Sequence, residues 1–171
     1  DEVEEADKRV EDEVRRLKRL VEEHTKRVED KVRTLKKLVK EHTDEVRRAV
    51  EELKRRRDDE ESVRRKIEEI KRRSDKIRRD VERKIEEVYR DSERELRRIK
   101  KEIEDVLREM KRRDIDEDVL RKVKELLEDV ARLVEESHEE ARKLLKEVED
   151  RLRESVREVE ELLRDVERRT R

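Results

Sequence analysis

The spacing of apolar residues in the first third of the chain is periodic. An apolar stripe begins at Val10 and advances in steps of 4, 3, 4, 3 and 4 positions to Val28, and the same steps then repeat towards Leu53. The mean step is 3.6 residues, which is the period of a straight α-helix and differs from the 3.5 of a supercoiled heptad. The spacing therefore predicts one long, nearly straight amphipathic helix.

The amino-acid text repeats with the same period. The segment RLVEEHTKRV at Arg19 returns as KLVKEHTDEV at Lys37, and LLEDV at Leu126 returns as LLKEV at Leu144 and LLRDV at Leu162. Each segment returns after 18 residues, which corresponds to five helical turns. It indicates an internal repeat of helix turns and not of folded domains.

A first interruption of the apolar stripe lies between Lys54 and Ser62, where no apolar residue occurs. Asp58 and Glu61 have the spacing of a capping box, which is typical of a helix start. One helix is therefore expected to end before this segment and a second to begin within it.

A second interruption lies at residues 111–114 and is followed by Ile115, Asp116 and Leu120. These three residues match a hydrophobic residue before the helix, an N-cap and the partner of a hydrophobic staple. Because the chain has no Gly, each helix has to end in the left-handed conformation on another residue or through a tight loop. The three predicted helices cover residues 2–56, 59–112 and 116–170.

Polar residues interrupt the stripe at matching heights in all three predicted helices. They are His24 and His42 in the first helix, Ser74 and Ser92 in the second, and Ser137 and Ser155 in the third. In an antiparallel helix pair, residues at one height have position numbers with a constant sum. That sum is 116 for the polar positions paired between the first two helices and 229 for those paired between the last two. Half of each sum gives the position at which the chain turns between the two helices, and each turn falls at one of the two interruptions.

This arithmetic predicts an all-α fold, an elongated up-down-up antiparallel three-helix bundle. Residues 1–171 form a single domain in this prediction, with nearly straight helices of about 54 residues and a length of about 80 Å. Charged residues make up 64% of the chain and apolar residues 29%, against about 45 to 50% apolar in a typical domain. A thin bundle explains this composition, because each layer needs only one or two apolar residues from each helix.

The charge balance argues against several classes of partner. Lys and Arg number 54 and Asp and Glu 55, and the two signs are closely interleaved, so no attraction to nucleic acid or to an anionic membrane is expected. No stretch approaches the roughly 20 apolar residues that span a bilayer, and no targeting signal is evident. We expect a soluble protein of undetermined location.

The two polar layers are the candidate functional residues. One layer is His24 with Ser92 and Ser137, and the other is His42 with Ser74 and Ser155; Thr25 and Thr43 flank the histidines. Neutral imidazole has one donor and one acceptor, and a hydroxyl can act as both, so such a layer can satisfy itself internally. We interpret the layers as structural features that set the register of the helices.

Two chemical interpretations of these layers compete with the structural one. A zinc site needs three or four converging ligands, and although His138 shares a level with His24, the His42 layer has no second histidine. Serine with histidine could form a nucleophile and base, but no orienting carboxylate is evident and no loop would form an oxyanion hole. The sequence therefore predicts no enzyme, no metal site and no cofactor.

The 18-residue period, the mirrored polar layers, the absence of Gly, Pro and Cys, and the crowded surface of Glu, Lys and Arg together resemble computationally designed single-chain three-helix bundles. Such bundles are built from parametric, nearly untwisted helices. The resemblance covers the whole chain, and it implies a hyperstable scaffold with no natural substrate and no required partner.

Two classes of function remain open at this level. The first is a monomeric structural scaffold. The second is a helix-mediated interaction or self-assembly module, in which helices swap between chains or leucines beside the stripe dock a partner. Those leucines are Leu20, Leu38, Leu126, Leu144 and Leu162. The mass of the protein in solution separates the two classes.

Overall fold

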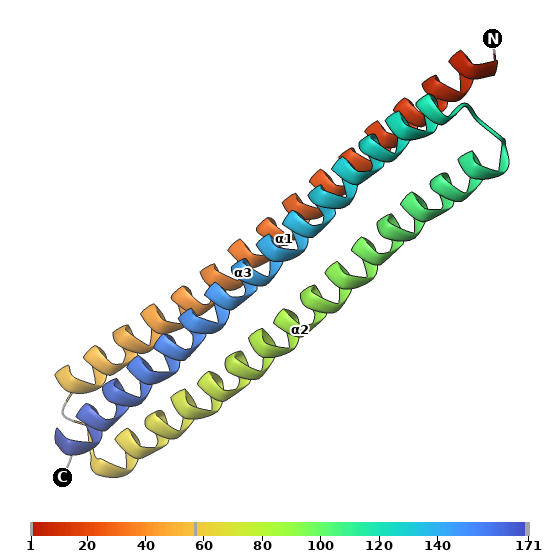
Figure 1. Ribbon diagram of the computed structural model, residues 1–171. Helices are drawn as coiled ribbons and strands as arrows, with labels where there is room; N and C mark the ends of the chain where they lie inside the picture. The colour runs from red at the N-terminus through yellow and green to blue at the C-terminus, as the bar shows by residue number, and fades with distance from the viewer. Residues whose placement is uncertain (1, 57, 170–171) are drawn as a thin grey trace. The chain divides into compact units, whose positions relative to one another are not determined.

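The computed structural model consists of three long helices joined by two short connections (Figure 1). It describes residues 2–56 and 58–169, without the side chains of residues 2–4, 6 and 7. The helices are α1 (Glu2–Arg55), α2 (Glu60–Arg112) and α3 (Glu117–Arg169). No strand occurs among the described residues. The predicted all-α, three-helix fold is confirmed.

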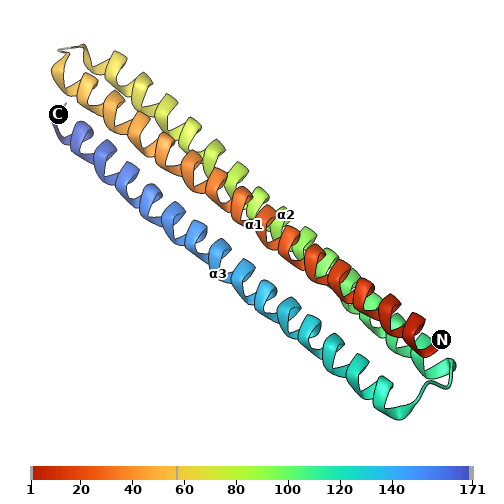
Figure 2. The same cartoon turned by 90° about the horizontal axis from the view of Figure 1, so that it is seen from above.

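The three helices form two compact units, and each helix contributes one segment to each unit. Unit 1 comprises residues 1–30 and 88–143, and unit 2 comprises residues 31–87 and 144–171. The α2–α3 connection belongs to unit 1, at the same end as the start of α1, and the α1–α2 connection belongs to unit 2 (Figure 1 and Figure 2). Each unit has its own apolar core and its own polar layer.

Unit 1 has a continuous apolar core in which Leu17, Val130 and Val134 have no measurable exposure. Arg16 Nη2 lies 2.8 Å from Glu102 Oε2, and further along α1 the partner on α2 is Ser92, which has a lower number. The α1 and α2 segments are therefore antiparallel. Two contacts show the same relation between α2 and α3, namely Tyr89 with Arg142 and Lys100 with Glu135.

Unit 2 has a core built on Val46, Val50 and Val63, with further apolar residues from all three helices. Three ion pairs join its α1 and α3 segments, and in each the two residues are 111 positions apart in the sequence. They are Lys36 with Glu147, Arg47 with Glu158, and Lys54 with Asp165. A constant separation means that these two segments run parallel, as expected for the first and third helices of an up-down-up bundle.

The apolar stripe of α1 is completely buried from Val10 to Leu53. The stripe of α2 is less uniform, because Ile70, Ser74 and Ile77 in unit 2 and Val106 in unit 1 are only half-buried. Three of these four residues are consecutive members of the stripe. The core of unit 2 is therefore least covered along this part of α2.

The start of α2 differs by one residue from the predicted capping box of Asp58 and Glu61. The Ser62 amide donates to Asp59 Oδ1 at 2.9 Å, and the Val63 amide donates to the Asp59 carbonyl at 3.1 Å. Asp59 is therefore the N-cap, so the prediction was wrong at this point. The Asp58 carboxylate instead pairs with the Lys66 ammonium at 3.2 Å.

The second connection follows the sequence-based prediction more closely. After α2 ends at Arg112, Asp114 adopts a left-handed conformation with φ of 52°, which Asp tolerates better than most residues. The Leu120 amide donates to the Asp116 carbonyl at 3.0 Å, which confirms Asp116 as the N-cap of α3. Ile115 and Leu120 both pack against the core of unit 1.

Candidate functional site

The polar residues predicted to interrupt the stripe lie in the interior of the two units. His24, Ser92 and Ser137 are buried in unit 1, and His42 and Ser155 are buried in unit 2. Ser74 is half-buried. The 3.6-residue spacing places these side chains on the same helix face as the apolar stripe, which is why they enter the core.

In unit 1 the buried polar residues form two hydrogen-bonded groups. His24 Nε2 lies 2.8 Å from Ser92 Oγ, which links α1 to α2. Ser137 Oγ lies 2.8 Å from Thr25 Oγ1, which links α3 to α1. Thr25 donates its hydroxyl proton to the Val21 carbonyl at 3.0 Å, so it accepts the proton of Ser137. The structure therefore joins His24 to Ser92 and gives Ser137 a different partner.

Unit 2 contains the same arrangement one repeat further along α1. His42 Nε2 lies 2.9 Å from Ser74 Oγ, and Ser155 Oγ lies 2.6 Å from Thr43 Oγ1. Thr43 donates to the Val39 carbonyl at 3.0 Å and so accepts from Ser155. Buried or half-buried hydrogen bonds between His, Ser and Thr thus connect α1 to both other helices in each unit.

The two units differ at the second nitrogen of the histidine. His24 Nδ1 lies 2.9 Å from Glu95 Oε2, and Glu95 also pairs with Arg27. The residue one repeat before Glu95 is Ile77, which cannot accept a hydrogen bond. His42 Nδ1 is buried and has no hydrogen-bond partner within the described part of the chain.

Burial lowers the pKa of His42 from its ordinary value of 6.5. Two charged neighbours have smaller and opposing effects, because Glu45 raises the pKa and Arg73 lowers it. His42 is therefore a neutral imidazole at pH 7, with a single ring proton that either Nδ1 or Nε2 carries.

The contact with Glu95 determines the tautomer of His24. A carboxylate only accepts hydrogen bonds, so in a neutral imidazole Nδ1 carries the proton and Nε2 accepts from the Ser92 hydroxyl. The order Ser92, His24, Glu95 is that of a nucleophile, a base and an orienting carboxylate. The expectation that no orienting carboxylate is present was therefore wrong.

This order of residues does not make Ser92 accessible to a substrate. Ser92 and His24 are each 2% exposed, so an ester or amide carbonyl cannot approach the Ser92 oxygen while the helices stay packed. Nucleophilic attack requires the reacting atoms about 3 to 3.5 Å apart. While the helices stay packed, a substrate carbonyl therefore cannot come within this distance of the Ser92 oxygen.

Three contact residues were not predicted as members of the layers, namely Thr25, Thr43 and Glu95. The threonines are adjacent to the histidines and outside the stripe, so the stripe gave no reason to place them in the core. Glu95 could have been identified from the sequence, because it lies one 18-residue repeat after Ile77, which belongs to the apolar stripe. An acidic residue at an apolar position of a repeat indicates a specific partner.

His138 lies near an aromatic side chain in unit 1. Its ring centroid is 6.5 Å from that of Tyr89, and Arg142 donates to the Tyr89 hydroxyl at 3.1 Å. No group of three or more His, Cys, Asp or Glu side chains that could hold a metal ion occurs among the described residues.

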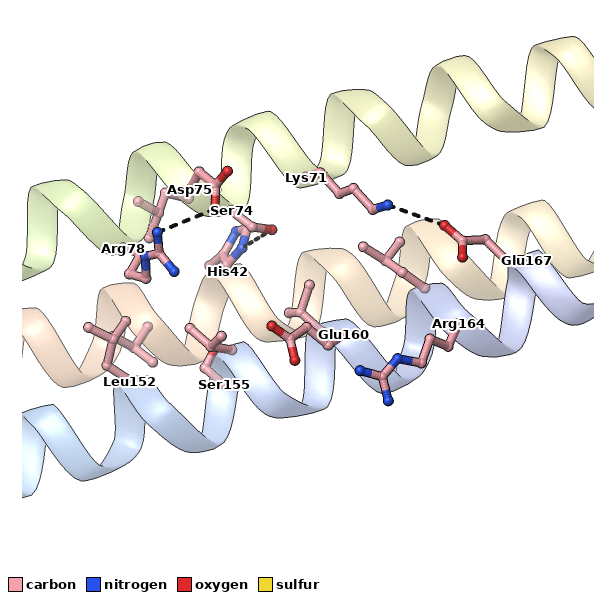
Figure 3. A pocket seen from close by; sticks show the side chains of 15 residues that line it. His42, Lys71, Ser74, Asp75, Arg78, Leu152, Ser155, Glu160, Arg164 and Glu167 are labelled. Carbon is pink, nitrogen blue, oxygen red and sulfur yellow. Dashed lines mark hydrogen bonds and ion pairs between the residues drawn. The ribbon is translucent and has the colours of Figure 1, made fainter.

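A groove opens between α2 and α3 in unit 2, with a volume of about 340 Å³ (Figure 3). His42 lies at its base beside Ser74, and Lys71 and Arg78 extend over it from α2. Lys71 pairs with Glu167 of α3 at 3.2 Å, and Arg78 pairs with Asp75 at 3.7 Å. The groove coincides with the half-buried part of the α2 stripe.

Comparisons with known proteins identify a similar solved structure but no family. No family model matches the chain, and no curated protein matches it. None of the described helices contains an apolar segment long enough to cross a bilayer. The chain is similar to a solved structure described as a computationally designed three helix bundle, with 20% identity over 98% of this chain and 88% of that chain and a TM-score of 0.49.

Proposed function

We propose that this protein is a designed, highly stable structural scaffold without natural catalytic activity, in which buried hydrogen bonds set the register of the helices. The observation that carries this proposal is the occurrence of the same two hydrogen bonds in both units, one repeat apart. His24 with Ser92 and Thr25 with Ser137 in unit 1 correspond to His42 with Ser74 and Thr43 with Ser155 in unit 2.

Register control follows from the cost of burying polar groups without partners. If one helix slides along another by a turn, an imidazole or hydroxyl meets Val or Ile in place of its partner. Each unsatisfied buried group costs about 1 to 3 kcal/mol. Apolar contacts alone discriminate less well, because most stripe residues are Val, Ile or Leu of similar size.

The alternative function, an interaction or self-assembly module, requires leucines that are available to a partner. Leu20 and Leu126 pack against the core of unit 1, and Leu162 packs against the core of unit 2. Leu38 and Leu144 are likewise half-buried. Because these leucines are half-buried within their own units, they offer little apolar surface to a partner. Their burial supports the scaffold over the interaction module.

Light scattering coupled to size exclusion tests the monomeric state. A single species near the chain mass of 21.3 kDa supports the scaffold, and a dimer or larger species supports the interaction module.

Circular dichroism then tests stability and the proposal that residues 1–171 form one domain. We expect one cooperative transition above the 45 to 65 °C of ordinary mesophilic domains, and either two separate transitions or melting within that range would contradict the proposal.

The register role has its own test, because the chain has no cysteine and can be spin-labelled at chosen sites. Labels at Lys37→Cys in α1 and Arg153→Cys in α3 report on the pairing of two exposed positions in unit 2. In the protein with its unit 2 polar layer unchanged, the distance between the two labels should have one narrow distribution. Replacing Thr43 by Val and Ser155 by Ala should broaden it, and an equally narrow distribution would show that the layer does not set register.

A further inference from the structure

Two side chains that line the groove between α2 and α3 of unit 2 each have a buried nitrogen atom without a hydrogen-bond partner in the described part of the chain. The two nitrogen atoms are His42 Nδ1 and Arg78 Nε. Unpaired buried polar atoms are rare in folded proteins, because each costs free energy unless water or a ligand satisfies it. Here both belong to side chains that line one groove (Figure 3).

The repeat provides an internal comparison for this groove. In unit 1 the matching positions hold Tyr89 and His138, whose rings lie close together between α2 and α3. One repeat away, the corresponding residues of unit 2 are Lys71 and Val156. The two rings thus have no counterpart in unit 2. The groove in unit 2 has a volume of about 340 Å³, and a pocket beside His138 in unit 1 has a volume of about 190 Å³.

A second difference concerns Arg78. The corresponding residue in unit 1 is Leu96, which is 3% exposed and belongs to the core. Arg78 therefore places a guanidinium where the repeat otherwise has an aliphatic side chain. Its Nε–H can only donate a hydrogen bond, so the atom that satisfies it has to be an acceptor.

His42 indicates the same kind of partner. In unit 1 the equivalent nitrogen of His24 lies 2.9 Å from a carboxylate oxygen of Glu95. In unit 2 the chain supplies no such oxygen, because Ile77 occupies that position. When Nε2 of His42 accepts from Ser74, Nδ1 carries a proton and needs an acceptor, as Arg78 Nε does.

We propose that this groove is a binding site for a small aromatic carboxylate. The ring occupies the space that the Tyr89 and His138 rings fill in unit 1, against the apolar side chains of Ile77, Val156 and Val159. The carboxylate accepts hydrogen bonds from Arg78 Nε–H and His42 Nδ1–H once the side chains that line the groove move apart, because both nitrogens are buried in the unliganded protein. The volume of the groove falls at the lower end of the range typical of ligand pockets, about 300 to 1,000 Å³.

The buried donors, and not the net charge of the groove, give this site its preference for an anion. Three cationic side chains line it, and three acidic ones balance them. The cationic residues are Lys71, Arg78 and Arg164, and the acidic residues are Asp75, Glu160 and Glu167. A neutral aromatic molecule of the same shape leaves the carboxylate interactions unmade. Charge-assisted hydrogen bonds are about twice as strong as neutral ones, so the anion is preferred.

The probe that tests the site is 2-naphthoate, with 2-naphthalenemethanol as the neutral control of the same ring size. Protein with ¹⁵N-labelled histidine is titrated with each compound at pH 7.5, and the imidazole signals are followed by two-dimensional NMR. We expect 2-naphthoate to move the signals of His42 and to leave those of His24 unchanged. The alcohol should bind about tenfold more weakly.

Two variants and a control distinguish the contribution of the hydrogen-bond donors to binding from the contribution of the groove's shape. Arg78→Leu, which installs the residue of unit 1, should weaken 2-naphthoate binding about tenfold, and Arg79→Leu at the exposed neighbouring position should not change it. Lys71→Tyr combined with Val156→His should fill the groove with the ring pair of unit 1 and abolish binding. Circular dichroism verifies that each variant keeps its helix content.

Several outcomes would overturn the proposal. One is equal binding of the alcohol and the carboxylate, and another is a uniform shift of all three histidines, which indicates non-specific association. Retained binding in the variant with the ring pair would place the ligand elsewhere. No shift of His42 at millimolar 2-naphthoate would show that the groove does not take this class of ligand.

Discussion

Nδ1 of His24 lies 2.9 Å from Oε2 of Glu95, and this contact is what distinguishes the two otherwise similar polar layers. The sequence around each histidine in α1 is nearly the same, so the difference arises from α2. A carboxylate at position 95 selects the Nδ1–H tautomer of a neutral imidazole in unit 1. Isoleucine at position 77 leaves the corresponding nitrogen of His42 unsatisfied.

The His24 and Glu95 side chains should show a favourable coupling in a double-mutant cycle. We expect His24→Ala, Glu95→Ala and the double variant to give a coupling free energy of about 0.5 to 1.5 kcal/mol from guanidinium unfolding at pH 7.5. Asp91 is exposed on α2 and serves as the control, with a coupling to His24 near zero. Equal values for the two cycles would mean that the hydrogen bond with Glu95 contributes nothing measurable.

The Thr43 and Ser155 hydroxyls should depend on each other. Thr43→Val preserves the size of the side chain but leaves Ser155 buried without its acceptor, so the free energy of unfolding should fall by about 1 to 3 kcal/mol. Adding Ser155→Ala removes the stranded hydroxyl and should recover part of this loss. If Ser155→Ala lowers the free energy of unfolding by the same amount in the Thr43→Val variant as in the parent protein, the two sites act independently.

The stability of the protein should decrease in mildly acidic solution because of His42. Burial lowers the pKa of His42 in the folded state, so below about pH 6.5 the unfolded chain binds more protons than the folded one. The contribution of neutral His42 is complete above pH 6.5 and declines as the pH falls toward the lower folded pKa. The guanidinium midpoint should therefore be lower at pH 5 than at pH 7.5.

The variant His42→Leu with Ser74→Ala isolates this effect from the titration of exposed carboxylates, which both proteins share. Its midpoint should change less between pH 7.5 and pH 5 than that of the parent. Because both hydrogen-bonding partners are replaced together, its stability at pH 7.5 should be unchanged or higher. An identical pH dependence in parent and variant would contradict the burial of His42 as a neutral group.

The N-cap assignment at the start of α2 distinguishes two adjacent aspartates. Asp59→Ala removes the acceptor for the Ser62 amide and should lower the free energy of unfolding by about 0.5 to 2 kcal/mol. Asp58→Ala removes only a surface ion pair with Lys66, for which about 0 to 1 kcal/mol is typical. Chemical denaturation of the two variants measures the difference, and a larger loss for Asp58→Ala would restore the capping box expected from the sequence.

Much of the fold could be predicted from the chain itself, because the information is periodic and local. The 3.6-residue spacing identifies the buried face of each helix, and all stripe residues of α1 from Val10 to Leu53 are buried as that spacing predicts. The constant sum of 116 for His24 with Ser92 and for His42 with Ser74 predicted both antiparallel hydrogen bonds between α1 and α2. The cap at Asp116 is likewise a local signal.

The sequence by itself thus determined the helices, their buried faces and the heights at which polar residues meet, since these depend on helical rise and period alone. Only the tertiary structure decided which side of each stripe faces which neighbour, because that depends on where the third helix lies, and a stripe pattern does not encode this choice. The choice of side brings Thr25 to Ser137 and Glu95 to His24. It also leaves His42 Nδ1 and Arg78 Nε without partners in the described part of unit 2, beside an open groove.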